Sequence, residues 1–256
     1  FNILDRDSNK FSFEVEVYML ELYQDQLMDL LNTEESKKLE IKKDQKGMVS
    51  VQGAVVKSVA DYQSFISLVN DGMKNRHVAA TKMNADSSRS HLILSVIVKS
   101  VNHQTQNNIV GKISFVDLAG SERIKKSGSA GEQLKEAQSI NKSLSALGDV
   151  ISALASEQQF IPYRNHKLTM LMSDSLGGNA KTLMFVNISP ASSNLDETQN
   201  SLMYAQRVRT ITNDAQKNVA TKKVAALDKM VAYWKEKAGG GAGGLDEIAE
   251  TRTPTK

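Results

Sequence analysis

The sequence predicts an α/β fold in which a layered, mixed β-sheet is flanked by helices. Residues 11–23 alternate in character and are rich in Phe, Val and Tyr, which is typical of a strand. Residues 131–155 instead place apolar side chains every three or four positions, the spacing of an amphipathic helix. Because segments of these two kinds are interleaved along the chain, we expect helices to pack on a sheet.

The first half of the chain is expected to contain short strands, one helix and a hairpin. Residues 25–31 are predicted as a short helical turn, and residues 37–59 as short strands around glycine-containing turns. Asp61 is expected to open a helix. The inner face of that helix would carry Tyr62, Phe65, Ile66, Leu68 and Val69. Residues 90–101 and 109–116 are apolar strands separated by a polar turn, which predicts a hairpin.

The second half is expected to add two helices and a strand. The apolar stripe of the helix at residues 131–155 is Leu134, Ala137, Ile140, Leu144, Leu147, Ile151 and Leu154. Residues 181–188 predict a last core strand, and residues 195–214 predict a last core helix. Together with the first half, these elements are expected to form one domain over residues 1–216.

The chain changes character after this domain. Residues 217–238 predict a basic amphipathic helix, with one apolar face and lysines around it. That apolar face carries Val224, Leu227, Val231 and Trp234. Residues 239–244 are almost all glycine and predict a flexible linker, followed by a polar tail to residue 256.

Composition excludes several classes of protein. The net charge of +3 over 256 residues is too small to argue for nucleic-acid binding. The absence of cysteine excludes a disulfide framework and a cysteine metal site. No apolar run approaches the ~20 residues of a membrane span, so we expect no membrane insertion. The first residues form neither a signal nor a transit peptide, and we expect the chain to begin within a longer protein.

Two short motifs carry most of the functional information. The first, at residues 84–91, places Ser87, Ser88 and Arg89 ahead of an apolar strand. The second, at residues 117–122, follows another apolar strand with Asp117, Gly120 and Glu122. Hydroxyl groups and an aspartate suit a Mg²⁺-phosphate, Asp117 being placed to reach the metal through water. Gly120 can offer its backbone N–H to a terminal phosphate, and Arg89 could close the pocket by pairing with Glu122.

Each motif alone has a simpler interpretation. The residues around Gly120 would form an ordinary turn after a strand, and the serine-rich stretch would be a solvated loop. His91 on its own is interpreted as a structural histidine. Only the joint occurrence of the two motifs predicts a nucleotide switch.

Several further motifs, in the same order, resemble those of the kinesin motor domain. They comprise Asn141-Lys142-Ser143-Leu144, residues 163–169 (with His166 where serine is more usual), residues 174–182 and residues 197–208. The resemblance covers residues 1–215 and implies an incomplete motor core related to the P-loop NTPases. No Gly-x-x-x-x-Gly-Lys-[Ser/Thr] loop occurs in the chain, so we expect that residues 1–256 alone neither bind ATP tightly nor hydrolyse it.

The resemblance implies an ATPase that binds ATP or ADP with Mg²⁺ and moves on microtubules. Asn84 would join Ser87, Ser88, Asp117 and Gly120 at the nucleotide, with Ser88 as a metal ligand. Asn141 would hold the relay helix in its nucleotide-sensitive position. The expected microtubule-binding residues are Arg123, Lys125, Lys126, Lys135, Lys142, Arg164 and Lys167. For any one of these lysines, a solvated charge is the simpler alternative.

The basic amphipathic helix predicted at residues 217–238 suggests that a regulatory protein binds there. Within the family, residues 231–236 resemble the helix of plant calmodulin-binding kinesins, whose motors lie at the C-terminus and move toward the minus end. This implies release from microtubules by calmodulin or a related EF-hand protein, with contacts from Val224, Leu227, Val231, Trp234 and Lys235. A coiled-coil neck, or a basic helix lying on the motor, is the alternative interpretation. The expected location is the cytoplasm, on the microtubule cytoskeleton.

Two other functions stay open from the sequence. A switch GTPase is disfavoured because the chain has no Asn-Lys-x-Asp guanine-reading motif. A kinesin-like protein that binds microtubules without turnover is the second alternative, and the residues that precede Phe1 would decide it.

Overall fold

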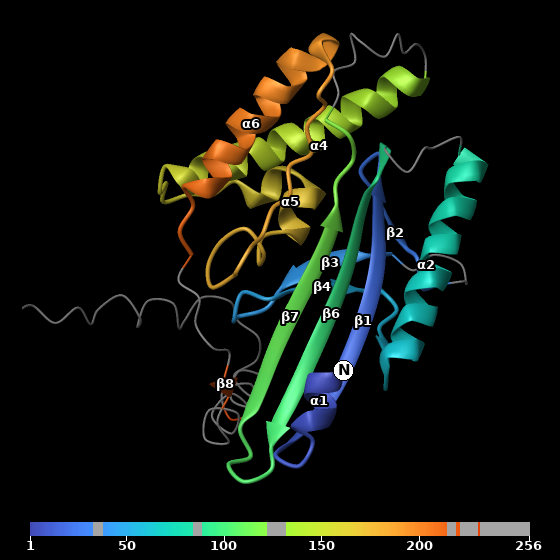
Figure 1. Ribbon diagram of the computed structural model, residues 1–256, viewed down its shortest axis with the longest axis vertical. Helices are drawn as coiled ribbons and strands as arrows, with labels where there is room; N and C mark the ends of the chain where they lie inside the picture. The colour runs from blue at the N-terminus through green and yellow to red at the C-terminus, as the bar shows by residue number, and fades with distance from the viewer. Residues whose placement is uncertain (33–37, 84–88, 122–131, 214–218, 221–229, 231–256) are drawn as a thin grey trace, which may run out of the picture.

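The computed structural model describes residues 1–32, 38–83, 89–121, 132–213, 219–220 and 230. Within them, a long twisted sheet stands between two groups of helices (Figure 1). The expected α/β class, a layered sheet flanked by helices, is confirmed, although the pairings between the described strands are all antiparallel and not mixed. None of the described helices is both long enough and apolar enough to cross a bilayer.

The main sheet is built on three long strands, and every pairing in it is antiparallel. These are β1 (Phe11–Tyr23), β6 (His91–Asn102) and β7 (Asn108–Asp117). The short strands β2 (Gln26–Asp29), β5 (Lys57–Ser58) and β8 (Val219–Ala220) add to its edges. The order is β2-β1-β6-β7-β8, with β5 also on β1. The strand at 11–23 and the hairpin at 90–116 are therefore confirmed.

A second, two-stranded sheet consists of β3 (Glu40–Lys43) and β4 (Val49–Gln52). Its turn is closed by Asp44, whose carboxylate accepts a hydrogen bond from the Met48 N–H, and by Gly47 at a φ of +87°. A positive φ of this size suits glycine because other residues would bring Cβ against the backbone. The short strands expected at residues 37–59 are thus confirmed.

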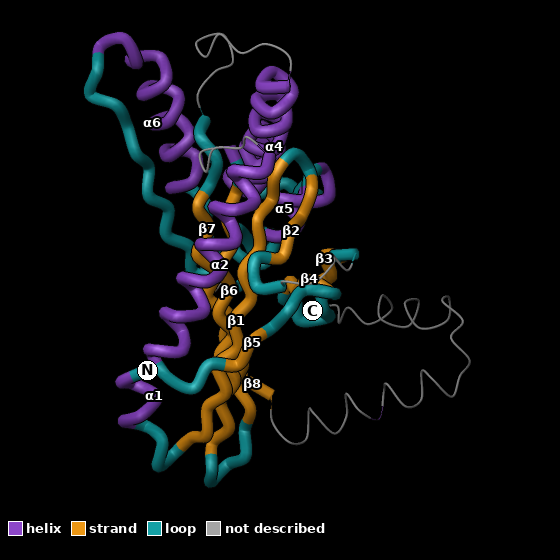
Figure 2. Tube along the Cα trace, turned by 90° about the vertical axis from the view of Figure 1, so that its right-hand side faces the viewer, coloured by secondary structure: helices purple, strands orange, loops and turns teal. Residues whose placement is uncertain are grey.

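The two faces of β1 pack on different helices. Val15 and Val17 face α1 (Asn2–Arg6) and α2 (Tyr62–Met83), with Val59 beside them. Gly72 lets α2 approach closely, since a Cβ there would collide with the Met19 sulfur. Because strand side chains alternate between faces, Tyr18, Leu20 and Leu22 point the other way. Figure 2 shows the sheet between α2 and the α4–α5 layer.

The second face carries the larger core. It packs on α4 (Glu132–Ala155) and α5 (Lys167–Leu171), which contact each other. Leu147, Val150 and Ile151 of α4 are at most 1% exposed. Leu147 and Ile151 belong to the predicted apolar stripe, whereas Val150 was not part of it. Fully burying each such side chain stabilises the fold by about 1.5–3 kcal/mol. This face fixes α4 at the end of the sheet where β6 begins and β7 ends.

Several expectations about elements are wrong. Residues 25–31 form a tight turn and β2 instead of a helical turn, because Gln26–Asp29 continues the ladder of β1. Residues 181–188 form no strand; Leu183 and Phe185 are 78% and 81% exposed, and none of the described strands is hydrogen-bonded to this segment in a ladder. Tyr62 is exposed at the start of α2 instead of packing inward.

The C-terminal part departs from expectation in two places. The helix α6 (Leu195–Arg209) ends before residue 214 and has no fully buried residue, so it covers the core from outside. Val219 and Ala220 pair with Asn108 and Ile109 of β7, where the start of a basic helix was expected. Apart from Met230, which is helical, the rest of residues 221–256 lies outside the described part of the chain.

Candidate functional site

The two sequence motifs meet at one edge of the sheet. His91 begins β6 and Asp117 ends β7, and the register places Leu92 opposite Asp117. The segments that contain Arg89 and Gly120 therefore leave the sheet side by side, at the end of the sheet that faces α4 (Figure 1). Hairpin pairing thus brings together two loops more than twenty residues apart in the sequence.

A buried arginine ties the bases of both motifs together. Arg76 of α2 is 4% exposed and contacts Glu21 of β1, Asp117 of β7 and Ser90, which directly precedes β6. Its Nη2 donates to the carbonyl and Oγ of Ser90, both at 3.3 Å, and its Nη1 to Asp117 Oδ2 at 3.3 Å. Ser90 also donates to Glu21 Oε1 at 2.5 Å, and Arg76 Nε lies 3.4 Å from the same oxygen. A buried charge of this kind needs such partners.

Arg89 contacts the long helix. Its Nη1 donates to Glu136 Oε2 at 2.8 Å, and the other Glu136 oxygen accepts a hydrogen bond from the Tyr23 hydroxyl. The Glu136 side chain is only 7% exposed, so both bonds are shielded from water. The expected partner, Glu122, lies outside the described residues. Sequence reasoning missed Glu136; the available signal was a carboxylate on the buried stripe, one turn before Ile140.

His91 makes a second connection to the same helix. The Ala119 N–H donates to His91 Nδ1 at 3.0 Å, so the ring proton lies on Nε2, 2.7 Å from Ser143 Oγ. Ser143 in turn donates to the Ile140 carbonyl at 2.6 Å. Burial lowers the pKa of His91 to about 4. The nearby His166 and Arg76 lower this pKa further, whereas the Asp117 carboxylate raises it. His91 is therefore a neutral, fully bonded structural residue, as expected.

The remaining described residues of the motifs fit a magnesium nucleotide. The Asp117 side chain is 68% exposed at the strand end and presents an oxygen ligand of the type that Mg²⁺ prefers. Gly120 is half-buried three residues further along. The other predicted nucleotide and loop residues lie outside the described residues: Asn84, Ser87, Ser88, Glu122, Arg123, Lys125 and Lys126.

Two of the predicted track-binding residues, Lys142 on α4 and Lys167 on α5, both donate hydrogen bonds to Asp25. Lys135 and Lys142 are exposed on α4, and Lys167 is exposed at the start of α5. Arg164 is exposed on the short 3-10 helix η2 (Tyr163–Asn165), which contacts both helices. Asn141 is half-buried on α4. The calmodulin-contact candidates Val224, Leu227, Val231, Trp234 and Lys235 lie outside the described residues.

His166, which stands where serine is more usual, begins the helix α5. It is the N-cap of α5, and its Nδ1 accepts a hydrogen bond from the Leu168 N–H at 3.1 Å. Its Nε2 lies 2.5 Å from Asp25 Oδ1. Burial lowers the pKa of His166, while the Asp25 carboxylate opposes that shift. The imidazole thus caps the helix and reaches a second element, which a serine is too short to do.

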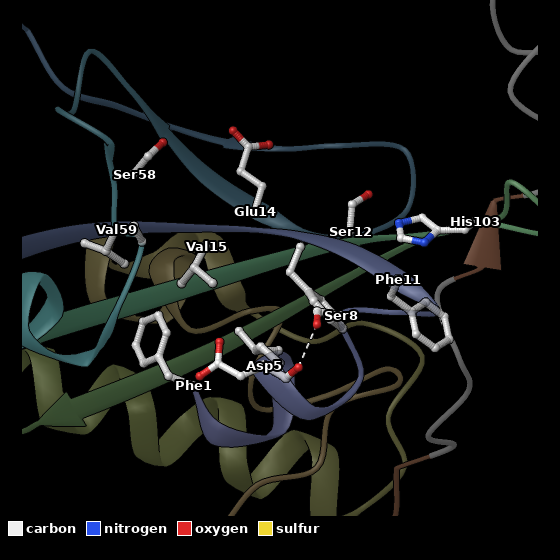
Figure 3. A pocket seen from close by; sticks show the side chains of 13 residues that line it. Phe1, Asp5, Ser8, Phe11, Ser12, Glu14, Val15, Ser58, Val59 and His103 are labelled. Atoms are coloured by element: carbon white, nitrogen blue, oxygen red, sulfur yellow. Dashed lines mark hydrogen bonds between the residues drawn. The ribbon is translucent and has the colours of Figure 1, made fainter.

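A pocket of about 620 Å³ lies far from these residues (Figure 3). It is lined by α1, the start of β1, residues 58–60 and His103. His103 belongs to the turn between β6 and β7, at the end of the sheet opposite Asp117. The pocket is therefore separate from the candidate switch site.

Comparisons with known proteins agree with this geometry. The family model for the kinesin motor domain matches residues 1–211. The chain is 62% identical over 258 residues to kinesin-like protein KIN-14I of Oryza sativa subsp. japonica, and 63% identical over 257 residues to KIN-14E of Arabidopsis thaliana. Each alignment covers 99% of this chain but only 21% and 20%, respectively, of those proteins.

Solved structures show the same fold. A fast kinesin matches with a TM-score of 0.75 and 38% identity, over 83% of this chain and 60% of that one. The C-terminal motor and motor homology domain of Kar3Vik1 matches with a TM-score of 0.72 and 40% identity, over 81% and 55%. A KIF14 dimer in complex with a microtubule matches with a TM-score of 0.77 and 36% identity, over 90% and 66%.

Proposed function

Because the chain belongs to the kinesin motor domain family, we propose that it forms the switch and track-binding part of an ATP-driven microtubule motor. The observation that carries this proposal is the double attachment of α4 to the two motifs. Arg89 bonds Glu136, and Ala119 is linked through His91 to Ser143. The same helix exposes Lys135 and Lys142. A change at the nucleotide can thus reach a basic surface through one rigid element.

The nucleotide end of the proposed mechanism uses the residues of both motifs. Ser88 and Asp117 would hold Mg²⁺, which neutralises phosphate charge when bound. Ser87 would position the attacking water, and Asn84 would complete the nucleotide contacts. Gly120 would donate its N–H to the terminal phosphate. The pair of Arg89 and Glu122 would close the pocket.

The mechanical end depends on α4. When the terminal phosphate leaves, Gly120 and the adjacent Ala119 are free to move. Ala119 is hydrogen-bonded to His91, and His91 is hydrogen-bonded to Ser143 of α4. A movement of Ala119 would therefore be transmitted to α4. Asn141 would keep the helix sensitive to the nucleotide. Linkage then requires that microtubule binding change nucleotide affinity in return.

The phosphate-binding loop of the motor is proposed to come from sequence outside this chain. Gly-x-x-x-x-Gly-Lys-[Ser/Thr] is absent from its 256 residues, and the chain spans about a fifth of the length of its KIN-14 relatives. Backbone N–H groups and a lysine in such a loop supply much of the affinity for phosphate. We therefore expect no ATP turnover from residues 1–256 alone.

Direction and regulation are proposed by similarity. The relatives named KIN-14 and the C-terminal motor of Kar3Vik1 support a motor of the C-terminal class. Minus-end-directed movement is what the resemblance of residues 231–236 implies for such a motor. The basic amphipathic pattern of residues 217–238 supports binding of calmodulin or a related EF-hand protein. A bound acidic calcium sensor would block binding to the acidic microtubule surface, both sterically and by charge repulsion. The proposed location of the motor is the cytoplasm, on microtubules.

The test compares ATP turnover with and without microtubules, in this chain and in the longer protein. We expect microtubule-stimulated turnover from the longer protein and none from the chain alone. Glu136→Gln should reduce the stimulation about tenfold or more, since a charge-assisted hydrogen bond is worth about 1.5–3 kcal/mol. Glu157→Gln removes the same charge just beyond α4 and should have little effect. A longer protein without any stimulation would contradict the proposal.

A further inference from the structure

The turn between β1 and β2 has an unusual backbone. Tyr23 pairs with Gln26, so Gln24 and Asp25 alone form the turn. Their φ angles are +46° and +63°. Two-residue hairpins of this kind favour asparagine and glycine, because other side chains are disfavoured in the left-handed region. A strained turn that places a charged residue at its tip invites a functional explanation.

Two lysines and a histidine converge on Asp25. Oδ1 lies 2.5 Å from His166 Nε2, and Oδ2 accepts a hydrogen bond from Lys142 Nζ at 3.3 Å. The backbone carbonyl of Asp25 accepts from Lys167 Nζ at 2.5 Å. Lys142 belongs to α4, whereas His166 and Lys167 begin α5. One residue of the turn therefore bridges both helices of the proposed track-binding side.

The same turn holds α4 at a second point. The Tyr23 hydroxyl donates to Glu136, and Gln24 Nε2 donates to the Tyr23 oxygen at 3.0 Å. Glu136 and Lys142 lie six residues apart on the same helix, so the turn spans more than one helical turn of α4. Tyr23 and Asp25 therefore hold α4 in its position at two points along the helix.

We propose that Asp25 is an internal substitute for the track: its carboxylate occupies Lys142, and its backbone carbonyl occupies Lys167, until tubulin carboxylates replace them. This inference rests on the proposed function. Lys142 and Asp25 are 66% and 43% exposed, so their pairing is weak and open to competition. An acidic microtubule surface offers many carboxylates at once, and it can displace a single internal one. Asp25 is a positioning residue that lowers the affinity of the motor for the track.

The test measures microtubule affinity of the longer motor in its ADP state. Asp25→Asn retains a residue that tolerates positive φ but removes the charge, and Asp25→Gly suits the turn and removes the whole carboxylate. Both variants should bind microtubules about two- to fivefold more tightly, as expected for exposed charge pairs. Their affinity should also fall more steeply with salt, because Lys142 is free for the track.

Two controls separate this effect from others. Asp71→Asn removes an equal charge from α2, where Asp71 pairs with Lys74, and should leave affinity unchanged. In a Lys142→Gln background, Asp25→Asn should give a smaller gain, which a double-mutant cycle measures. Unchanged or weakened binding by both Asp25 variants, with normal binding by the unsubstituted motor, would overturn the inference alone. Failure of the unsubstituted motor to bind would overturn the proposed function and the inference with it.

Discussion

His91 illustrates how one residue can join distant parts of this chain. Both ring nitrogens are used, one by the Ala119 backbone and the other by Ser143 of α4. The Ala119 bond requires an unprotonated Nδ1, so protonation of the ring would break the link between the second motif and the helix. The neutral ring is therefore part of the structure.

The lowered pKa of His91 predicts a pH-dependent stability. Between about pH 4 and the ordinary histidine value of 6.5, the unfolded state binds more protons than the folded state. The free energy of unfolding should thus fall as the pH drops through this window, by about 3 kcal/mol in total from this group. Urea unfolding at pH 7.5 and pH 4.5 measures it.

His91→Gln provides the comparison for this pH effect. The variant should show a smaller loss of stability between the two pH values, with the remaining loss partly due to His166, whose pKa is also lowered. An identical loss in the variant and the unsubstituted chain would contradict the assignment.

At the scale of elements, a buried ion pair joins β7 to the small sheet and to the segment after α5. Lys112 donates to Asp174 at 2.8 Å and to the Val49 carbonyl at 2.9 Å, while the Val49 N–H donates to the same carboxylate. The side chains of Lys112 and Asp174 are only 8% and 10% exposed. Removing one partner would leave the other charge buried and uncompensated.

Lys112→Met should therefore lower the free energy of unfolding by about 3 kcal/mol or more. The matched control is Lys99→Met on β6, where Lys99 is 41% exposed and pairs with Glu14 and Glu16. That variant should lose less than about 1 kcal/mol, because exposed ion pairs contribute little. Urea unfolding of the two variants makes the comparison; equal losses would contradict it.

At the scale of the whole molecule, the sheet is covered unequally. The face that carries Tyr18 and Leu20 is packed by α4 and α5, and β1 is covered on its other face by α2. Ile113 and Phe115 of β7 lie on that second face and are 54% and 57% exposed. Exposed apolar side chains next to each other on a sheet favour association.

We therefore expect the isolated chain to self-associate through this part of β7. Phe115→Ser should weaken the association about tenfold, since burying a phenylalanine is worth about 1.5–3 kcal/mol. Phe160→Ser is the control, because Phe160 is 74% exposed beyond the end of α4. Sedimentation velocity over a range of concentrations measures the effect, and equal behaviour of both variants would argue against this surface.

The sequence by itself determined the elements whose signals are local. The alternation of residues 11–23, the apolar stripe through Leu147 and Ile151, and the hairpin at residues 90–116 correspond to observed elements because period and turn chemistry act within a short segment. The two motifs also placed Arg89 and Asp117 at strand ends, since each adjoins an apolar run. Assignment to the kinesin family followed from the order of such motifs.

Only the tertiary structure decided which groups meet across the chain. Glu136 as a partner of Arg89, and Asp25 as a partner of Lys142, depend on contacts over 47 and 117 positions that no local pattern encodes. The prediction of a strand at residues 181–188 was wrong because it, too, depended on contacts with a distant part of the chain. A strand exists only when a neighbour supplies its hydrogen bonds, and that neighbour is a property of the whole fold.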